Sequence, residues 1–434
     1  MTRSISTLCP PTPLPPQPIR SALQSLLPIT PGSPRSIRAT RRRSPASLGS
    51  LVLGAALLAI VGAACASRSP DGGEGESREE IGRAVLATLT DSASPATPIE
   101  PGSGEAHFER LWRLTFGGQN AEAYFSADGR QLIFQGRRAG EVECDQIYTM
   151  DVNGANRRLV STGEGRTTCG FFFPGGDRIL YSSTHHVSAA CPPVPDRSRG
   201  YVWPIHDYDI FTARPDGSDL RRLTETSGYD AEATISTDGR SIVFTSMREG
   251  DLDLYVMAAD GGAVRRVTHE EGYDGGAFFS PDGTKIVYRA HHPTDPAELA
   301  DYRALRDAGL LRPNRVEIQI MNADGSDKRQ LTRNGAANFA PYFHPNGRQI
   351  IFSSNVHDPT GRSFSLYMID VDGGNLRRLT HHEGFDGFPM FSPDGTMLVF
   401  ASSRGAGEPG EINLFVAEWR DDAEDGRQIE EMPQ

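Results

Sequence analysis

The sequence lacks the motifs of several common enzyme classes. It has no Gly-x-Ser-x-Gly nucleophile motif, and only a short stretch follows Glu418, so we do not expect a serine-hydrolase activity. A glycine-rich phosphate loop is also missing. The stretch 370–373 begins like a calcium-binding loop but lacks the glutamate that completes one. We therefore interpret such stretches as hairpin turns.

Positive charge and cysteine are also scarce. The 434 residues include 44 Lys and Arg against 56 Asp and Glu, and the net charge of -12 argues against nucleic acids and anionic membrane surfaces as partners. Besides Cys9 and Cys65, three cysteines remain. In an oxidising compartment one disulfide is expected, and from the reach of the loops we favour Cys144 with Cys191 over pairs that use Cys169.

What the sequence does contain is a repeated hairpin. In the clearest copy, two apolar runs flank Ser280-Pro281-Asp282-Gly283, where Pro presets φ, Asp can bond the backbone and Gly takes the positive φ that ends the turn. Related turns lie at 125–129, 173–177, 235–239, 343–347 and 391–395. A second hairpin with an Asx-Gly turn and a basic outer strand follows each of the first five.

The spacing of these units predicts the fold. Two hairpins recur about every 45 residues, apart from two insertions, and this period is typical of propeller blades. We predict an all-β, six-bladed β-propeller of four-stranded antiparallel blades. The last unit lacks its outer strand, and a matching strand, 111–115, precedes the first unit. This N-terminal strand is therefore predicted to complete the last blade and close the ring.

The remaining segments have compositions of other kinds. In residues 1–65 a basic region and a short apolar run precede small residues and Cys65, which predicts a secretory signal. The small-small-Cys ending resembles a lipobox, so Cys65 is the predicted lipidation site, with a cleaved signal or a single membrane anchor as alternatives. Residues 66–105 predict a flexible linker with a short helix at 78–89, 106–419 the propeller, and 420–434 a disordered acidic tail.

The repeats resemble those of the TolB propeller family over about 111–419. TolB is the periplasmic component of the Tol-Pal system, so the resemblance implies a periplasmic or membrane-tethered bacterial protein that binds an envelope protein or peptide. We expect a monomer that is non-catalytic, has no cofactor and meets the membrane only through its lipid or anchor. The same repeats build the oligogalacturonate lyase propeller, and the alternative is therefore a metal-dependent polysaccharide lyase.

We letter the strands of each blade a to d from the channel outward. The resemblance implies a propeller geometry in which the b–c and d–a loops share one face and the a–b and c–d turns share the other. The two insertions, 184–206 and 290–315, lie there, with most of the eleven histidines. A binding protein would use this His-rich loop face as it is. An enzyme would need at least three histidines to meet roughly 2.0–2.2 Å from one divalent metal. The predicted ligands are His185, His291, His357 and His382.

An Asp or Asn recurs at a fixed distance before five of the six a–b turns, and Thr167 has this position before the turn at 173–177. These side chains either stabilise the d–a turns by bonding backbone N–H groups or form a polar ring at the channel mouth that binds a peptide, cation or sugar. These residues are Asn120, Asp230, Asp274, Asn338 and Asp386. Glu122 and Glu232 follow two of them, and Arg248 follows a second strand. We expect these three to add charge to the same binding face.

Overall fold

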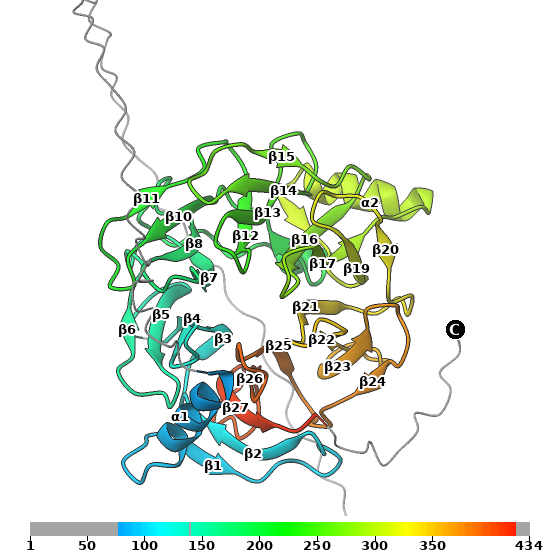
Figure 1. The fold of residues 1–434 in the computed structure, drawn as a ribbon. Helices are drawn as coiled ribbons and strands as arrows, with labels where there is room; N and C mark the ends of the chain where they lie inside the picture. Colours follow the sequence, from blue (N-terminus) through cyan, green and yellow to red (C-terminus); the bar gives the residue numbers. More distant parts are fainter. Residues whose placement is uncertain (1–76, 139, 422–434) are drawn as a thin grey trace, which may run out of the picture. The chain divides into compact units, whose positions relative to one another are not determined.

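The computed structural model describes residues 77–138 and 140–421, which fall within one compact unit. Six antiparallel sheets stand around a central axis as the blades of a propeller (Figure 1). The prediction of a six-bladed, four-stranded propeller is therefore confirmed. The predicted signal region, with the predicted lipidation site Cys65, and the acidic tail beyond Asp421 lie outside the described residues.

Each blade is described from its innermost strand outward. Blade 1 contains β3 (Gln119–Phe125), β4 (Gln131–Arg137), β5 (Gln146–Asp151) and β6 (Arg158–Leu159). Blade 2 contains β7 (Thr167–Phe172), β8 (Ile179–Ser183), β10 (Asp209–Ala213) and β11 (Arg221–Arg222). Blade 3 contains β12 (Asp230–Ile235), β13 (Ser241–Ser246), β14 (Asp253–Ala258) and β15 (Arg265–Arg266).

The other three blades follow the same order. Blade 4 contains β16 (Tyr273–Phe279), β17 (Lys285–His291), β19 (Glu317–Asn322) and β20 (Arg329–Gln330). Blade 5 contains β21 (Asn338–Phe343), β22 (Gln349–Ser354), β23 (Ser365–Asp370) and β24 (Arg377–Arg378). Blade 6 contains β25 (Asp386–Phe391), β26 (Met397–Ser402), β27 (Asn413–Trp419), β2 (Phe108–Arg113) and a fifth strand, β1 (Thr97–Ile99).

The predicted turn chemistry explains the a–b hairpins. In blade 4 the Ser280 hydroxyl donates to Asp282 Oδ1 at 2.6 Å, and Gly283 has φ +70°. The second strands read as nearly continuous apolar runs because neighbouring blades cover both of their faces; every residue of β26 is buried. These turns lie at one end of the blades, which we call the turn face, and the b–c and d–a loops lie at the other end, the loop face.

The ring closes through the N-terminal strand, as predicted. β2 pairs antiparallel with β27, with Leu111 opposite Ala417 and Trp112 opposite Val416. A parallel bridge between Gln119 and Ile412 also joins blade 6 to blade 1, as similar bridges join other neighbouring blades. The pairing of β1 with β2 on the outer edge of blade 6 was not predicted.

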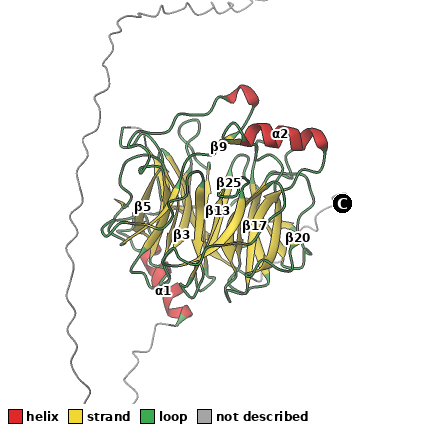
Figure 2. Ribbon diagram, turned by 90° about the horizontal axis from the view of Figure 1, so that it is seen from above, coloured by secondary structure: helices red, strands yellow, loops and turns green. Residues whose placement is uncertain are grey.

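The described part of the predicted flexible linker, 77–105, is ordered structure. Helix α1 (Arg78–Thr90) begins at a capping box between Ser77 and Glu80. Ile81, Val85 and Leu89 recur on one helix face, and the last two are buried against the propeller. Figure 2 shows α1 at the opposite end of the blades from α2 (Pro296–Arg306), hence at the turn face.

The two insertions pair with each other on the loop face. The blade 2 insertion contains the 3-10 helix η1 (Arg197–Arg199) and β9 (Trp203–Pro204), and the blade 4 insertion contains α2 and β18 (Leu310–Leu311). β9 pairs with β18, and we call this pair the cross-blade ribbon. The disulfide joins Cys144 to Cys191, the favoured pair, and ties the blade 2 insertion to blade 1. No helix in the described part of the chain is long and apolar enough to cross a membrane.

Candidate functional site: the central channel

All six innermost strands carry a β-bulge at the same place, and the bulged residues point into the channel. Their pairing register shifts in every blade. The residues at this position all have a left-handed backbone, with φ between +48° and +58°, and line one cavity of about 30 Å³. We call them the channel ring: Glu122, Cys169, Glu232, Gly276, Ala340 and Phe388.

An aromatic plug closes the middle of the channel. It consists of Tyr124, Phe171, Phe278 and Tyr342, each two residues beyond a member of the channel ring. The ring centroids of Tyr124 lie 5.2 Å from those of Phe171 and 5.6 Å from those of Phe278, and Phe278 lies 5.2 Å from Tyr342. Phe171 and Phe278 line spaces on both sides. The plug therefore separates two spaces: one is bordered by charged side chains, and we call it the polar cavity, whereas the other is bordered by none among the described residues.

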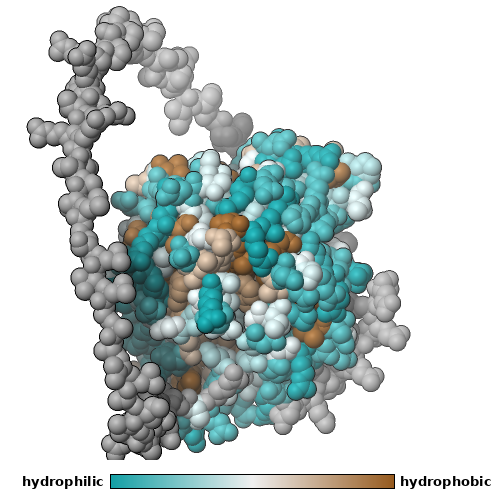
Figure 3. Space-filling view, turned by 45° about the horizontal axis from the view of Figure 1, so that its top comes forward, coloured by the Kyte–Doolittle hydropathy of each residue, from teal (hydrophilic) through white to brown (hydrophobic). Residues whose placement is uncertain are grey.

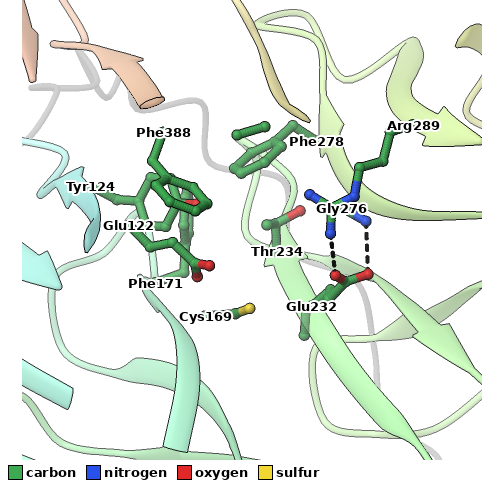
Figure 4. Close-up of a pocket in the computed structure, with 12 residues that line it drawn as sticks. Glu122, Tyr124, Cys169, Phe171, Glu232, Thr234, Gly276, Phe278, Arg289 and Phe388 are labelled. Carbon is green, nitrogen blue, oxygen red and sulfur yellow. Dashed lines mark hydrogen bonds and ion pairs between the residues drawn. The ribbon is translucent and has the colours of Figure 1, made fainter. Parts of the chain in front are cut away.

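One side of the polar cavity is a saturated ion pair. Glu232 is paired with Arg289 and accepts hydrogen bonds from Tyr273 and Thr245. The network needs space at Gly276, because a Cβ there would lie 2.8 Å from Arg289 Nη1. Figure 4 shows the guanidinium and the carboxylate facing each other. The carboxylate of Glu232 therefore has its charge and its lone pairs occupied.

The opposite side of the cavity has an unpaired carboxyl. Glu122 Oε2 is buried and has no hydrogen-bond partner among the described residues. Burial raises the pKa of Glu122 to about 7, although the Cys169 thiol and Arg289 act to lower it. Cys169 is in no disulfide with a described residue, and burial raises the pKa of its thiol well above the usual value. These two groups lie across the cavity from the Glu232–Arg289 pair (Figure 4).

The cross-blade ribbon lies over this charged network. The Arg289 guanidinium lies 5.3 Å from the centroid of Trp203 in β9, and Trp203 also packs on Phe339 of blade 5 at 5.3 Å. α2 fixes the ribbon, since the Tyr302 hydroxyl donates to Asp251 Oδ1 at 2.5 Å. On the loop face, Trp203 of the ribbon thus packs against the side of the channel formed by Arg289 and Phe339.

The turn face carries an apolar pocket of about 300 Å³. We call it the turn-face bowl. The second residue of every a–b turn lines it, and the plug forms its floor. These rim residues are Ala127, Pro174, Thr237, Pro281, Pro345 and Pro393. Figure 3 shows apolar residues gathered near the middle of the visible surface, within a hydrophilic surround.

The predicted polar ring is structural. Its members begin the innermost strands, are buried, and are bonded within the protein. Asn120 donates to the carbonyls of Gly117 and Ile412 at 3.0 Å, and Asp230 accepts two bonds of 3.1 Å from Arg248. The predicted binding-face residue Arg248 is thus paired within its own blade. Asp274 contacts His292, Asn338 donates to Val316, and Asp386 pairs with Arg404.

The four histidines predicted as metal ligands do not meet. His185 lies 2.7 Å from Ser183 Oγ and packs on Phe211, and His382 lies 3.2 Å from Ser403 Oγ. Burial lowers the pKa of His291, and it lowers that of His357 to about 4. Among the described residues, no three His, Cys, Asp or Glu side chains are placed to share a metal ion. A place on the same face therefore did not bring these imidazoles to one point.

Sequence reasoning placed Glu122 and Glu232 near the channel but missed their partners. Arg289 interrupts the apolar run of β17, and this charged residue within a buried strand was a usable signal. The Gly275-Gly276 pair was a second one, because it leaves room for the ion-pair network. The sequence pattern placed Cys169 only among the less favoured disulfide pairs, not in the channel. The bowl was missed because its rim comes from six turns spread along the chain.

The fold and this site define the class of protein: a six-bladed β-propeller whose channel is closed by its own side chains. The family model of the TolB beta propeller domain matches residues 205–302 and 311–418. Over these two stretches the chain is similar to the TolB β-propeller family. No protein with a curated description matches the sequence.

Solved structures of similar fold include two TolB proteins and a lyase. The putative TolB from Agrobacterium tumefaciens is 20% identical, with TM-score 0.47, over 70% of this chain and 91% of that chain. TolB from Acinetobacter baumannii is 18% identical, with TM-score 0.46, over 69% and 63%. An oligogalacturonate lyase in complex with manganese is 17% identical, with TM-score 0.44, over 76% and 97%.

Proposed function

We propose that this protein is a non-catalytic binding protein of the bacterial cell envelope, and that its turn-face bowl takes an apolar side chain from a protein or peptide partner. The observation that carries the proposal is the bowl itself, an apolar pocket of about 300 Å³ ringed by all six a–b turns. Pockets of this size and polarity are typical of ligand sites. A bulky aliphatic or aromatic side chain is the matching chemistry.

This proposal moves the binding site from the His-rich loop face to the turn face. On the loop side, Trp203 of the cross-blade ribbon packs on Arg289, whereas on the turn side the exposed residues Ala127 and Thr237 form part of the bowl's rim. A rigid ring of short turns also loses little conformational entropy when it binds a partner.

The envelope location rests on two features. The Cys144–Cys191 disulfide fits an oxidising compartment such as the periplasm. In addition, the sequence before the propeller reads as a signal ending at Cys65. We propose a monomer that is held at the membrane through a lipid on Cys65 or through an N-terminal anchor.

The test uses a displayed library of short random peptides, selected on the purified full chain. We expect the selected peptides to share a Phe, Leu or Trp anchor. Thr237→Asp should weaken their binding at least tenfold, because it places a charge on the rim of the bowl. The turn should tolerate this change, since Thr237 is exposed and stands where four of the other five turns have proline and the fifth has Ala127.

Two control variants make the result specific. Leu220→Asp adds the same charge at an exposed apolar residue that does not line the bowl, and should leave binding unchanged. His291→Ala alters the loop face. Loss of binding in His291→Ala with normal binding in Thr237→Asp would contradict the proposal and return the site to the loop face.

A further inference from the structure

The polar cavity above the aromatic plug contains an unbalanced charge. Of the two channel-ring carboxylates, Glu232 is neutralised by Arg289 and accepts bonds from three other donors: Tyr273, Thr245 and the Gly276 amide. Glu122 has no such partner for Oε2 among the described residues. With both glutamates ionised, the lining therefore carries one net negative charge, located at Glu122. A buried charge of this kind is costly unless a counter-charge meets it.

The rest of the lining offers aromatic surface. Tyr124, Phe171, Phe278 and Phe388 all line the cavity that Glu122 enters (Figure 4). Aromatic faces attract cations through the ring quadrupole, and cages that combine them with a carboxylate suit ammonium groups. An anion would be repelled by the ring faces and by the Glu122 carboxylate.

Size and ligand count narrow the class of cation. The cavity volume of about 30 Å³ exceeds the roughly 10–15 Å³ that a single water needs, so about two small atoms fit. A divalent transition metal would need three or more donor side chains, and the described residues provide no such group. A primary ammonium group on one carbon matches the volume, the charge and the lining.

We infer that the cavity bounded by Glu122, Phe388 and the aromatic plug is a binding site for a primary alkylammonium group, which forms an ion pair with Glu122. Such a group occurs at the end of a lysine side chain and in free small amines. This site lies on the other side of the plug from the turn-face bowl, so the inference does not depend on the proposed function.

Proton binding competes with the cation at Glu122. The charged and titratable groups that face it are Cys169 from β7, Glu232 from β12, Arg289 from β17 and Asp145 from the loop before β5. Arg289 is already paired, and the Cys169 thiol stays protonated because burial raises its pKa. Glu122 itself, with its pKa of about 7, is the group whose charge changes near neutral pH.

The experiment is calorimetric titration of the full chain with methylammonium chloride, at constant ionic strength. We expect methylammonium to bind at pH 8. At pH 6 the affinity should be about tenfold lower, because most of Glu122 is protonated at that pH. Glu122→Gln should weaken binding at least tenfold, and Glu143→Gln, an exposed glutamate of the same blade, should not. Tetramethylammonium, which is too large for the cavity, should not bind.

Several results would overturn the inference. These are equal affinity for methylammonium in the wild type and Glu122→Gln, tight binding of tetramethylammonium, or no binding to the folded wild type at pH 8. The wild-type pH series decides the matter even if Glu122→Gln does not fold. A lysine amide with a blocked α-amino group and a free side-chain ammonium separates the two sources. Binding of both this probe and methylammonium indicates a partner's lysine, and binding of methylammonium alone indicates a free amine. Thr237→Asp should leave these affinities unchanged.

Discussion

Two glutamates at the same place in their blades have opposite surroundings. Glu232 shares its charge with Arg289 and with hydroxyl and amide donors, whereas Glu122 Oε2 has no partner among the described residues. Both have a left-handed backbone, a conformation that costs an L-residue about 1–2 kcal/mol. The channel ring is thus held in place by the surrounding blades and not by local preference.

The titration of Glu122 predicts a pH-dependent stability. Its carboxyl loses a proton near pH 4.5 when unfolded and near pH 7 when folded, so between these values the folded state binds more protons. The free energy of unfolding should therefore fall as pH rises from 4.5 to 7, by about 3 kcal/mol from this group, and then level off. Denaturant unfolding at pH 5 and pH 8 measures the fall.

The matched variant for this prediction is Glu122→Gln, which cannot ionise. It should lack this part of the pH dependence and should be more stable than the wild type at pH 8. Glu143→Gln, at an exposed position, should behave as the wild type does. If Glu122→Gln and the wild type lost equal stability between pH 5 and pH 8, Glu122 would not be the titrating group.

At the scale of elements, α1 and the cross-blade ribbon are additions to the repeats, and they pack on the propeller at its turn face and its loop face. α1 buries Val85 and Leu89, and Glu105 pairs with Arg404 of blade 6 at 2.5 Å. The ribbon joins two insertions that lie more than a blade apart in sequence. Each element therefore covers the ends of blades that the repeats alone would leave exposed to solvent, and in this way stabilises those blades.

Helix α1 predicts a clear effect of a buried truncation. Leu89→Ala should lower the free energy of unfolding by about 2–5 kcal/mol, because it leaves a cavity where the helix packs on the propeller. Thr88→Ala, one residue away on the exposed side, should change it by less than about 0.5 kcal/mol. Equal, small effects in both variants would mean that this segment behaves as the flexible linker that its composition predicted.

At the scale of the whole molecule, the ring is closed by a strand far from the rest of its blade in sequence. Leu111 and Trp112 of β2 are buried against β27 of blade 6. Without β2, β27 would be an exposed apolar edge and a site for aggregation. Closure thus protects the last blade as well as joining it to the first.

Two truncated chains test closure. A chain that begins at residue 106 lacks α1 and β1 but keeps β2, and should unfold cooperatively at a reduced thermal midpoint. A chain that begins at residue 116 lacks β2 as well. It should lose its cooperative transition or aggregate, since the burial of Leu111 and Trp112 alone is worth several kcal/mol of a total stability of about 5–15 kcal/mol. Identical midpoints for the two chains would refute closure by β2.

The sequence by itself determined the blades, because a β-hairpin turn such as Ser280-Pro281-Asp282-Gly283 is specified by residues next to one another. It also determined the place of the closing strand, since the last unit lacks its outer strand and the strand at 111–115 belongs to no other unit. For the same reason it placed Glu122 and Glu232 near the channel, at one position of the repeat.

Only the tertiary structure decided what these residues do. Glu232 meets Arg289, 57 residues away, and Glu122 meets no comparable partner, yet the two occupy equivalent repeat positions. The four histidines, which the sequence places on one face, do not come together at one metal position. The bowl arises from six turns and the cross-blade ribbon from two insertions. Such contacts depend on how the ring brings distant segments together. The sequence pattern shows how far apart two residues are along the chain, but not how far apart they are in space.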